Sequence, residues 1–314
     1  MTRFDRFEAS SHLRSAVFAF FFAPLALVLM GSSMADVQTM TALGQPLASV
    51  EGLVGMALAS ILLALVSISS DRSPAGMIVT FLASIVVGAL QLSGRLTVPF
   101  LMASVVDRPD MSASMSWNLY PVIVVGIMAG ATCAFILTLR DAPARQVHSL
   151  KRLRSHPHAW VASLALPLAL IAMMLLIHVA PTDTTAVAAQ GLSGVIAERV
   201  LEPIFPLIVT VLLAAVAFVA RWSLTGPQLA AWLVLVLPSY LFQPLWSSLT
   251  GHVVTPGASL STQVAMAAPV ATSLGLALAT STIGLFWARI GDDEGEDASA
   301  VMNQSPSDPR IAGD

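Results

Sequence analysis

The chain has 314 residues, of which 56% are hydrophobic and 11% are charged, and its formal net charge is −3. Soluble domains carry about 25% charged residues, so this composition, with a mean hydropathy of +0.81, excludes an ordinary soluble protein. The single cysteine, Cys133, excludes an internal disulfide and any multi-cysteine metal centre.

Eight apolar blocks along the chain approach or exceed the roughly 20 residues that cross the hydrocarbon core of a bilayer. Because a segment in lipid must satisfy its backbone hydrogen bonds internally, each block is expected to be a helix. The predicted fold is therefore an all-α, multi-pass membrane protein with eight transmembrane helices. The blocks lie at about residues 16–34, 51–69, 75–101, 119–139, 159–180, 204–220, 228–246 and 264–289.

The first block has some features of a secretory signal peptide. Arg3, Arg6 and Arg14 precede the apolar stretch Ala16–Met30, and Ser33–Ala35 is an acceptable cleavage site. We predict a retained membrane helix, because the basic region is long and the block has a counterpart in the second half of the chain. Cleavage stays the alternative.

The basic residues are distributed unevenly among the predicted loops. With the N-terminus inside, twelve of the fifteen Lys and Arg residues fall on the cytoplasmic side, as the positive-inside rule expects. We therefore predict a protein of the cytoplasmic membrane with both termini inside. The cytoplasmic set is Arg3, Arg6, Arg14, Arg72, Arg140, Arg145, Lys151, Arg152, Arg154, Arg221, Arg289 and Arg310.

The two halves of the chain share an ordered set of landmarks. Segments 12–30 and 152–174 both contain Leu-Arg-Ser followed by Pro-Leu-Ala-Leu, and the last helix of each half has an early proline, Pro121 or Pro269. This order predicts two four-helix repeats with the same topology, as in transporters built from parallel repeats.

Four regions follow from this repeat. Residues 1–140 and 159–290 are the predicted membrane repeats, 141–158 is a basic amphipathic cytoplasmic linker, and 291–314 is an acidic tail expected to be disordered. In the linker, basic side chains favour contact with anionic lipid at the membrane surface rather than nucleic acid. The predicted lipid contacts are Arg145, Lys151, Arg152 and Arg154.

Polar and helix-breaking residues interrupt the third and seventh blocks at corresponding places. The third contains Gln91 and Arg95 in ALQLSGRLTVPF, and the seventh contains Gln243 in VLPSYLFQPLW. Matching interruptions in both repeats are typical of a transporter's binding region. The alternative is that both helices end there, with Arg95 reaching the membrane surface.

Three acidic residues lie at the starts of corresponding predicted helices. Glu51 begins the second block, while Glu198 and Glu202 precede the sixth and share one helical face. They could bind a cation or pass a proton at the membrane mouth. The alternative is a solvated turn before each helix.

The tetrapeptide Gly-Leu-Ser-Gly at 191–194 resembles the serine motif of rhomboid intramembrane proteases. That resemblance implies Ser193 as nucleophile and His252 as its base. We place Ser193 in a polar external loop, where this chemistry does not fit.

Small residues recur at four-residue intervals in the last helix of each repeat. Gly126 and Gly130 form one pair, and Ala271, Gly275 and Ala279 form another series. Such faces allow close helix packing, either between repeats or in a dimer.

These features predict transport or flipping of a small molecule or lipid, without an ATPase of the protein's own. The alternative is a non-catalytic membrane subunit or envelope-assembly partner of a larger complex. We expect no enzymatic activity, cofactor or metal, with a rhomboid-like serine protease that uses Ser193 and His252 as the remote alternative. The expected partners are the lipid bilayer, the transported small molecule or lipid, and a second copy or membrane-complex subunit, but no nucleic acid.

Overall fold

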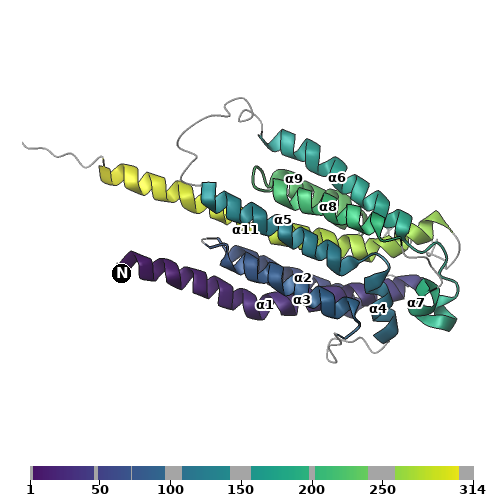
Figure 1. Ribbon diagram of the computed structural model, residues 1–314. Helices are drawn as coiled ribbons and strands as arrows, with labels where there is room; N and C mark the ends of the chain where they lie inside the picture. Colours follow the sequence, from purple (N-terminus) through teal and green to yellow (C-terminus); the bar gives the residue numbers. More distant parts are fainter. Residues whose placement is uncertain are drawn as a thin grey trace, which may run out of the picture.

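The computed structural model describes residues 3–45, 49–71, 73–95, 108–141, 157–197, 202–239 and 259–303. These residues are helical, with no strand among them, and most of the long helices run along one direction as an elongated bundle (Figure 1). The all-α prediction is confirmed for this part of the chain. The long elements are α1 (Arg3–Ala42), α2 (Val50–Ile68), α3 (Ala75–Leu92), α5 (Tyr120–Asp141), α6 (Pro157–Val179), α8 (Ile204–Val219) and α11 (Leu260–Asn303).

Four shorter elements complete this part of the fold. The helix α9 (Thr225–Leu229) continues directly into the π-helical segment η2 (Ala230–Val236). The other two, α4 (Arg108–Ser116) and α7 (Val187–Ala197), were not predicted from the sequence. The segment containing Ser193, predicted as a polar loop, is thus part of a helix.

Six helices in the described residues are long and apolar enough to cross a membrane. Each of the other two predicted blocks, 204–220 and 228–246, also begins as an apolar helix, but the described parts are shorter. The candidate spans are Ser11–Ala42, Val50–Ile68, Ala75–Leu92, Tyr120–Arg140, Ala159–Val179 and Leu260–Ala288. A multi-pass membrane protein is the class that fits these helices.

Two predicted boundaries differ from the structure. The helix expected over 75–101 ends at Leu92, and Gly94 then adopts a φ of +64°, a conformation that favours glycine and ends helices. At the C-terminus, α11 continues to Asn303, into the segment expected to be a disordered tail. Alanine, glutamate and methionine in that segment favour helix.

The two ends of the bundle differ in composition. The end that holds the start of α1 and the finish of α11, here called the terminal end, also holds the exposed residues Arg14 and Arg140 (Figure 1). The opposite end, here called the cap end, holds α4 and α7, and its exposed residues include Glu51 and Glu202. The basic linker residues 142–156 lie outside the described part.

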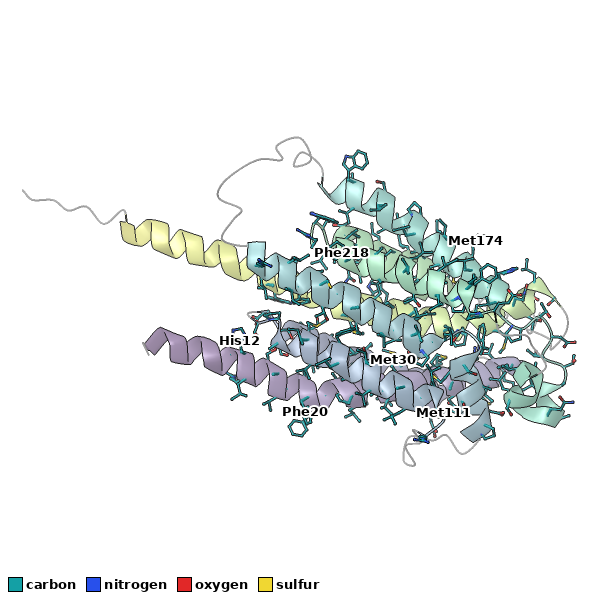
Figure 2. The ribbon with its side chains drawn as sticks, viewed as in Figure 1. His12, Phe20, Met30, Met111, Met174 and Phe218 are labelled. Atoms are coloured by element: carbon teal, nitrogen blue, oxygen red, sulfur yellow. The ribbon has the colours of Figure 1, made fainter. Side chains whose placement is uncertain are left out.

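Large apolar side chains cover the outside of the bundle. Phe20 on α1 is 65% exposed and points away from the other helices (Figure 2). Exposure of large hydrophobic residues along several helices is expected of a surface that meets lipid rather than water. On α2 the exposed series is Val50, Val54, Leu58, Ile61 and Leu65.

The helices of the two halves pack in corresponding ways. In the first half α1 packs against α2 and α3, and α3 packs against α5. In the second half α6 packs against α8 and the α9–η2 segment, and η2 packs against α11. The contacts between halves also correspond, because α5 packs against α8 while α11 packs against α2.

Small residues allow the close approach of α5 and α8. A Cβ atom at residue 126 would lie 2.5 Å from Cγ2 of Thr210, and one at residue 130 would overlap the carbonyl oxygen of Ala214. The Gly126–Gly130 face therefore lies between the two halves of one chain. Gly275 on α11 instead packs against Leu235 in its own half.

The contact between α2 and α11 is both close and polar. Ser67 donates its hydroxyl to the carbonyl of Ser281 at 3.1 Å and accepts the backbone N–H of Gly284 at 3.0 Å. A Cβ atom on residue 284 would overlap the Ser67 carbonyl oxygen. Glycine at this position thus permits two hydrogen bonds between the halves.

Candidate functional site

The predicted pathway residues at the cap end have different environments. Gln91, in the last turn of α3, is buried, whereas Arg95 is exposed just beyond the end of that helix. Gln243 lies outside the described residues. The structure therefore places Gln91 in the bundle interior and Arg95 at its surface.

Gln91 projects into a space made by a glycine. A Cβ atom on Gly31 of α1 would overlap Nε2 of Gln91 and would lie 3.0 Å from the methyl carbon of Met115 on α4. Nε2 of Gln91 is buried and has no hydrogen-bond partner. The amide therefore lies where α1, α3 and α4 meet, with its donor capacity unused.

A second buried glutamine, Gln38, has hydrogen-bond partners for both its amide nitrogen and its amide oxygen. Gln38 on α1 donates to the carbonyl of Met266 on α11 at 3.0 Å, and its Oε1 accepts from the hydroxyl of Ser114. The indole N–H of Trp117 also reaches that oxygen, at 3.5 Å. Because these groups come from α1, α11 and the α4 region, Gln38 connects three parts of the cap end.

Asn118 lies in the turn between α4 and α5. Its Oδ1 accepts the backbone N–H of Tyr120 at 2.8 Å, whereas its buried Nδ2 has no partner. The next residue, Leu119, has a φ of 51°. Leucine rarely adopts this left-handed conformation, and such local strain is more frequent at functional sites.

The buried hydroxyl of Tyr120 joins the two halves of the bundle. It lies 2.5 Å from the hydroxyl of Ser273, in the interior of α11. The start of α5 and the middle of α11 are thus held together by a polar contact where the halves meet.

Two of the three predicted acidic candidates, Glu51 and Glu202, lie exposed at the surface. The third, Glu198, is outside the described residues.

Another acidic residue, Asp183, lies on the exposed loop after α6. Hydrogen bonds from the backbone N–H and hydroxyl of Thr185 lower the pKa of its carboxyl. A carboxylate whose pKa is lowered by neutral donors stays ionised near neutrality and is unsuited to accepting a proton there.

Two buried carboxylates were not among the predicted candidates. Asp36 on α1 accepts the hydroxyl of Ser49, which itself caps the start of α2. Asp110 on α4 accepts the backbone N–H of Ser193 at 2.9 Å and its hydroxyl at 2.7 Å. Through these hydrogen bonds, both carboxylates therefore link helices at the cap end.

These contacts give Ser193 a structural role. It follows Gly191, where α7 is kinked with a φ of 71°, and a Cβ atom at residue 191 would lie 2.7 Å from the Asp110 carboxylate. A carboxylate that receives both the N–H and the O–H of Ser193 holds α7 against α4. His252, the predicted base, lies outside the described residues.

At the terminal end, the described part of the chain presents basic and aromatic residues together. The guanidinium of Arg221 lies 4.9 Å from the ring centre of Trp222 and 5.6 Å from that of Phe218. Trp160 is exposed at the start of α6. Arginine and tryptophan are the residues that gather at membrane–water interfaces. The predicted lipid contacts Arg145, Lys151, Arg152 and Arg154 lie outside the described residues.

Within the described residues, no group of three His, Cys, Asp or Glu side chains is placed to hold a metal ion.

The sequence patterns singled out Gln91 but not Gln38 or Asn118. The signal for Asn118 was its position two residues before Tyr120, where a helix cap is common.

The chain resembles no protein of known function closely enough to assign a family. No family model, curated protein or solved structure matches it. Its function must therefore be inferred from the geometry.

Proposed function

We propose that the protein spans the cytoplasmic membrane eight times as two same-topology repeats, with both termini inside. A small molecule or lipid crosses the membrane along the contact between the repeats, without an ATPase in the chain. The observation that carries this proposal is a set of buried polar side chains at the cap end. Gln38 and Tyr120 bond across the halves to Met266 and Ser273, and two amides of the first half have unused donors. Such groups are costly in a membrane interior and are typical of substrate pathways.

The correspondence between the halves supports the same function. Transporters built from repeats move substrate at the repeat interface by rocking one unit against the other. Here α5–α8 and α2–α11 are corresponding contacts between the halves, and α5 also packs against α11. The uneven distribution of basic and acidic residues between the two ends supports the proposed orientation.

The alternative is a non-catalytic subunit that holds a membrane complex together. One observation favours it, since one large cluster of buried apolar residues extends through both halves. The predicted small-residue faces argue the other way, because Gly126, Gly130 and Gly275 pack inside the chain rather than on its exterior.

Vesicles containing the purified full chain separate the two functions. The lipid probe is a fluorescent phosphatidylglycerol bleached from outside by dithionite, and the solute probes are urea and potassium chloride with valinomycin, followed by re-swelling after an osmotic step. Transport predicts that at least one probe moves faster than in protein-free vesicles. Rates equal to protein-free vesicles for every probe, together with a stoichiometric partner retained in mild detergent, would favour the subunit.

A further inference from the structure

The short helix α7 belongs to the second half of the chain but packs on the first half. The helices that contact it most are α4 and α1, although its neighbours in the sequence are α6 and α8. Figure 1 shows α7 beside α4 at the cap end, on the opposite side of the bundle from α6. The chain therefore crosses from the second half to the first half between α6 and α7.

The segment before α7 is anchored to the second half. The backbone N–H of Ser259, just before α11, donates to the carbonyl of Thr182 at 3.2 Å. Nε2 of Gln263, on α11, donates to the carbonyl of Ala180 at 3.4 Å. Only residues 183–186 separate these anchors from the start of α7, and a chain extends by at most about 3.6 Å per residue. The halves therefore cannot move far apart at the cap end while α7 stays on α4.

One carboxylate of the first half holds α7 in place. A single oxygen of Asp110 on α4 accepts both the backbone N–H and the hydroxyl of Ser193, at 2.9 and 2.7 Å. Hydrogen bonds to an ionised acceptor are roughly twice as strong as those between neutral groups. Gly191, with its φ of 71°, allows the backbone of α7 to approach the same carboxylate. Two hydrogen bonds to one side chain thus join the two halves.

This contact can part more easily than the contact between α2 and α11. Asp110 lies at the end of the bundle and is 9% exposed, so water can replace the donors of Ser193 once α7 moves away. Ser67 is fully buried, and its two hydrogen bonds to α11 lie where a Cβ atom on Gly284 would overlap a backbone carbonyl oxygen. Separation at Ser67 would leave buried polar groups without partners.

The helix α4 also reaches the place where the halves meet. Ser114 on α4 donates to Gln38, which in turn donates to the carbonyl of Met266 on α11. After α4 the chain turns into α5, where the hydroxyl of Tyr120 meets that of Ser273. The contact between α4 and α7 therefore lies at the cap end of the contact between the halves.

We infer that the α4–α7 contact is a gate that closes the cap end of the pathway between the halves. The inference rests on the proposed function, whose regulation it names. While Asp110 is bonded to Ser193, α7 holds the halves together at this end. When both bonds break, α7 moves with the second half, and the Tyr120–Ser273 contact becomes accessible from the cap end.

A disulfide in place of the Asp110–Ser193 contact tests the gate. In a Cys133→Ala background, Asp110→Cys and Ser193→Cys are combined with Ser273→Cys, and oxidation joins the first two positions before labelling. The readout is the rate at which a membrane-impermeant thiol reagent modifies position 273 in sealed vesicles. The 110–193 disulfide should slow labelling from the cap-end face at least about tenfold, because it removes the open population, and should not slow labelling from the opposite face.

The matched control is a similar pair of side chains within the first half. Asp36 on α1 accepts the hydroxyl of Ser49 before α2, so Asp36→Cys with Ser49→Cys places a disulfide at the same end without joining the halves. Position 273 in this chain should be labelled from the cap-end face as fast as in the chain without a disulfide. Equal cap-end rates with the 110–193 and the 36–49 disulfides would overturn the gate.

Removal of the carboxylate tests the gate in the opposite direction and does not depend on disulfide formation. Asp110→Ala should raise the cap-end labelling rate of Ser273→Cys at least about threefold, because it removes both hydrogen bonds, whereas Asp36→Ala should not. A rate no higher than that of Asp36→Ala would overturn the gate.

The same measurements separate the gate from the proposed function. Labelling of Ser273→Cys from both faces, at rates that neither the 110–193 disulfide nor Asp110→Ala changes, would leave the pathway and remove only the gate. Absence of cap-end labelling in the chain without a disulfide would remove the pathway, and the gate with it.

Discussion

Two buried glutamines at the cap end show that the same side chain can either stabilise the fold or remain available to bind a ligand. Gln38 bonds to Met266, Ser114 and Trp117 through both its amide nitrogen and its amide oxygen, and it connects α1, the α4 region and α11. Gln91 is also buried but leaves its Nε2 unpaired. A satisfied buried amide stabilises the fold, whereas an unsatisfied one costs free energy until a ligand arrives. Stability and binding should therefore respond in opposite ways to mutations at these two positions.

The largest loss of stability is expected from Gln38→Leu. The substitution leaves the Ser114 hydroxyl, the Trp117 N–H and the Met266 carbonyl without their partner in a buried region, which costs about 2–4 kcal/mol of unfolding free energy. Denaturant unfolding followed by circular dichroism in detergent measures it. The control is Gln45→Leu at the exposed amide. Equal stability of the Gln38→Leu and Gln45→Leu chains would contradict the bonded network.

Gly31→Ala should have the next largest effect. The added methyl group overlaps Nε2 of Gln91, and overpacking of this kind costs about 1–3 kcal/mol. In a Gln91→Ala background the clash disappears, so Gly31→Ala should then cost much less. A double-mutant cycle measures this coupling. Additive effects would show that Gln91 does not lie over Gly31.

Substitution can separate the role of the oxygen of the Asn118 side chain from that of its nitrogen. Asn118→Leu removes the oxygen that accepts the Tyr120 N–H and should lower the unfolding free energy by about 1 kcal/mol. Asn118→Ser retains an oxygen that can accept the Tyr120 N–H and should lose less stability than Asn118→Leu. Thermal unfolding of both variants measures the difference. A loss for Asn118→Ser as large as that for Asn118→Leu would contradict the capping role.

The smallest effect on stability is expected from Gln91→Met. Methionine matches glutamine in length and has no donor to leave unpaired, so the unfolding free energy should change by less than about 0.5 kcal/mol or increase. The same denaturant series measures it. A loss comparable to that of Gln38→Leu would mean that the Gln91 amide is bonded and that the comparison fails.

The sequence predicted the long helices well because their signal is simple. A block of apolar residues near spanning length can satisfy its backbone in lipid only as a helix, and each predicted block contains one. The residues at which each helix begins and ends were harder to predict. In the third block, apolar residues continue past Gly94, although the helix ends at Leu92. The short helix α4 lacks an apolar run, and the apolar helix α7 is too short to span a bilayer, so neither gave such a signal.

The candidate site was only partly predictable. Gln91 was conspicuous as a polar residue inside an apolar block, and its burial follows from that position. Gln38 was not conspicuous, since its importance depends on contacts with Ser114 and Met266, which are far away in the chain. Asn118 offered only a local signal, its capping position before Tyr120. Sequence spacing along one helix cannot indicate whether a buried amide will find a partner on another.

The central claim is that a solute pathway runs between the two halves, past the Tyr120–Ser273 contact. Ser273 is fully buried, and Cys133 is the chain's single cysteine. In a Cys133→Ala background, Ser273→Cys can therefore be tested with a membrane-impermeant thiol reagent applied to each face of sealed vesicles. Leu82→Cys on the exposed apolar surface of α3 is the lipid-facing control, and Ser93→Cys just beyond that helix is the one-sided control.

Alternating access predicts that the folded Ser273→Cys protein is labelled from both faces, while Leu82→Cys is labelled from neither and Ser93→Cys from one. Labelling of Ser273→Cys from one face alone, or from neither, would contradict a pathway between the halves.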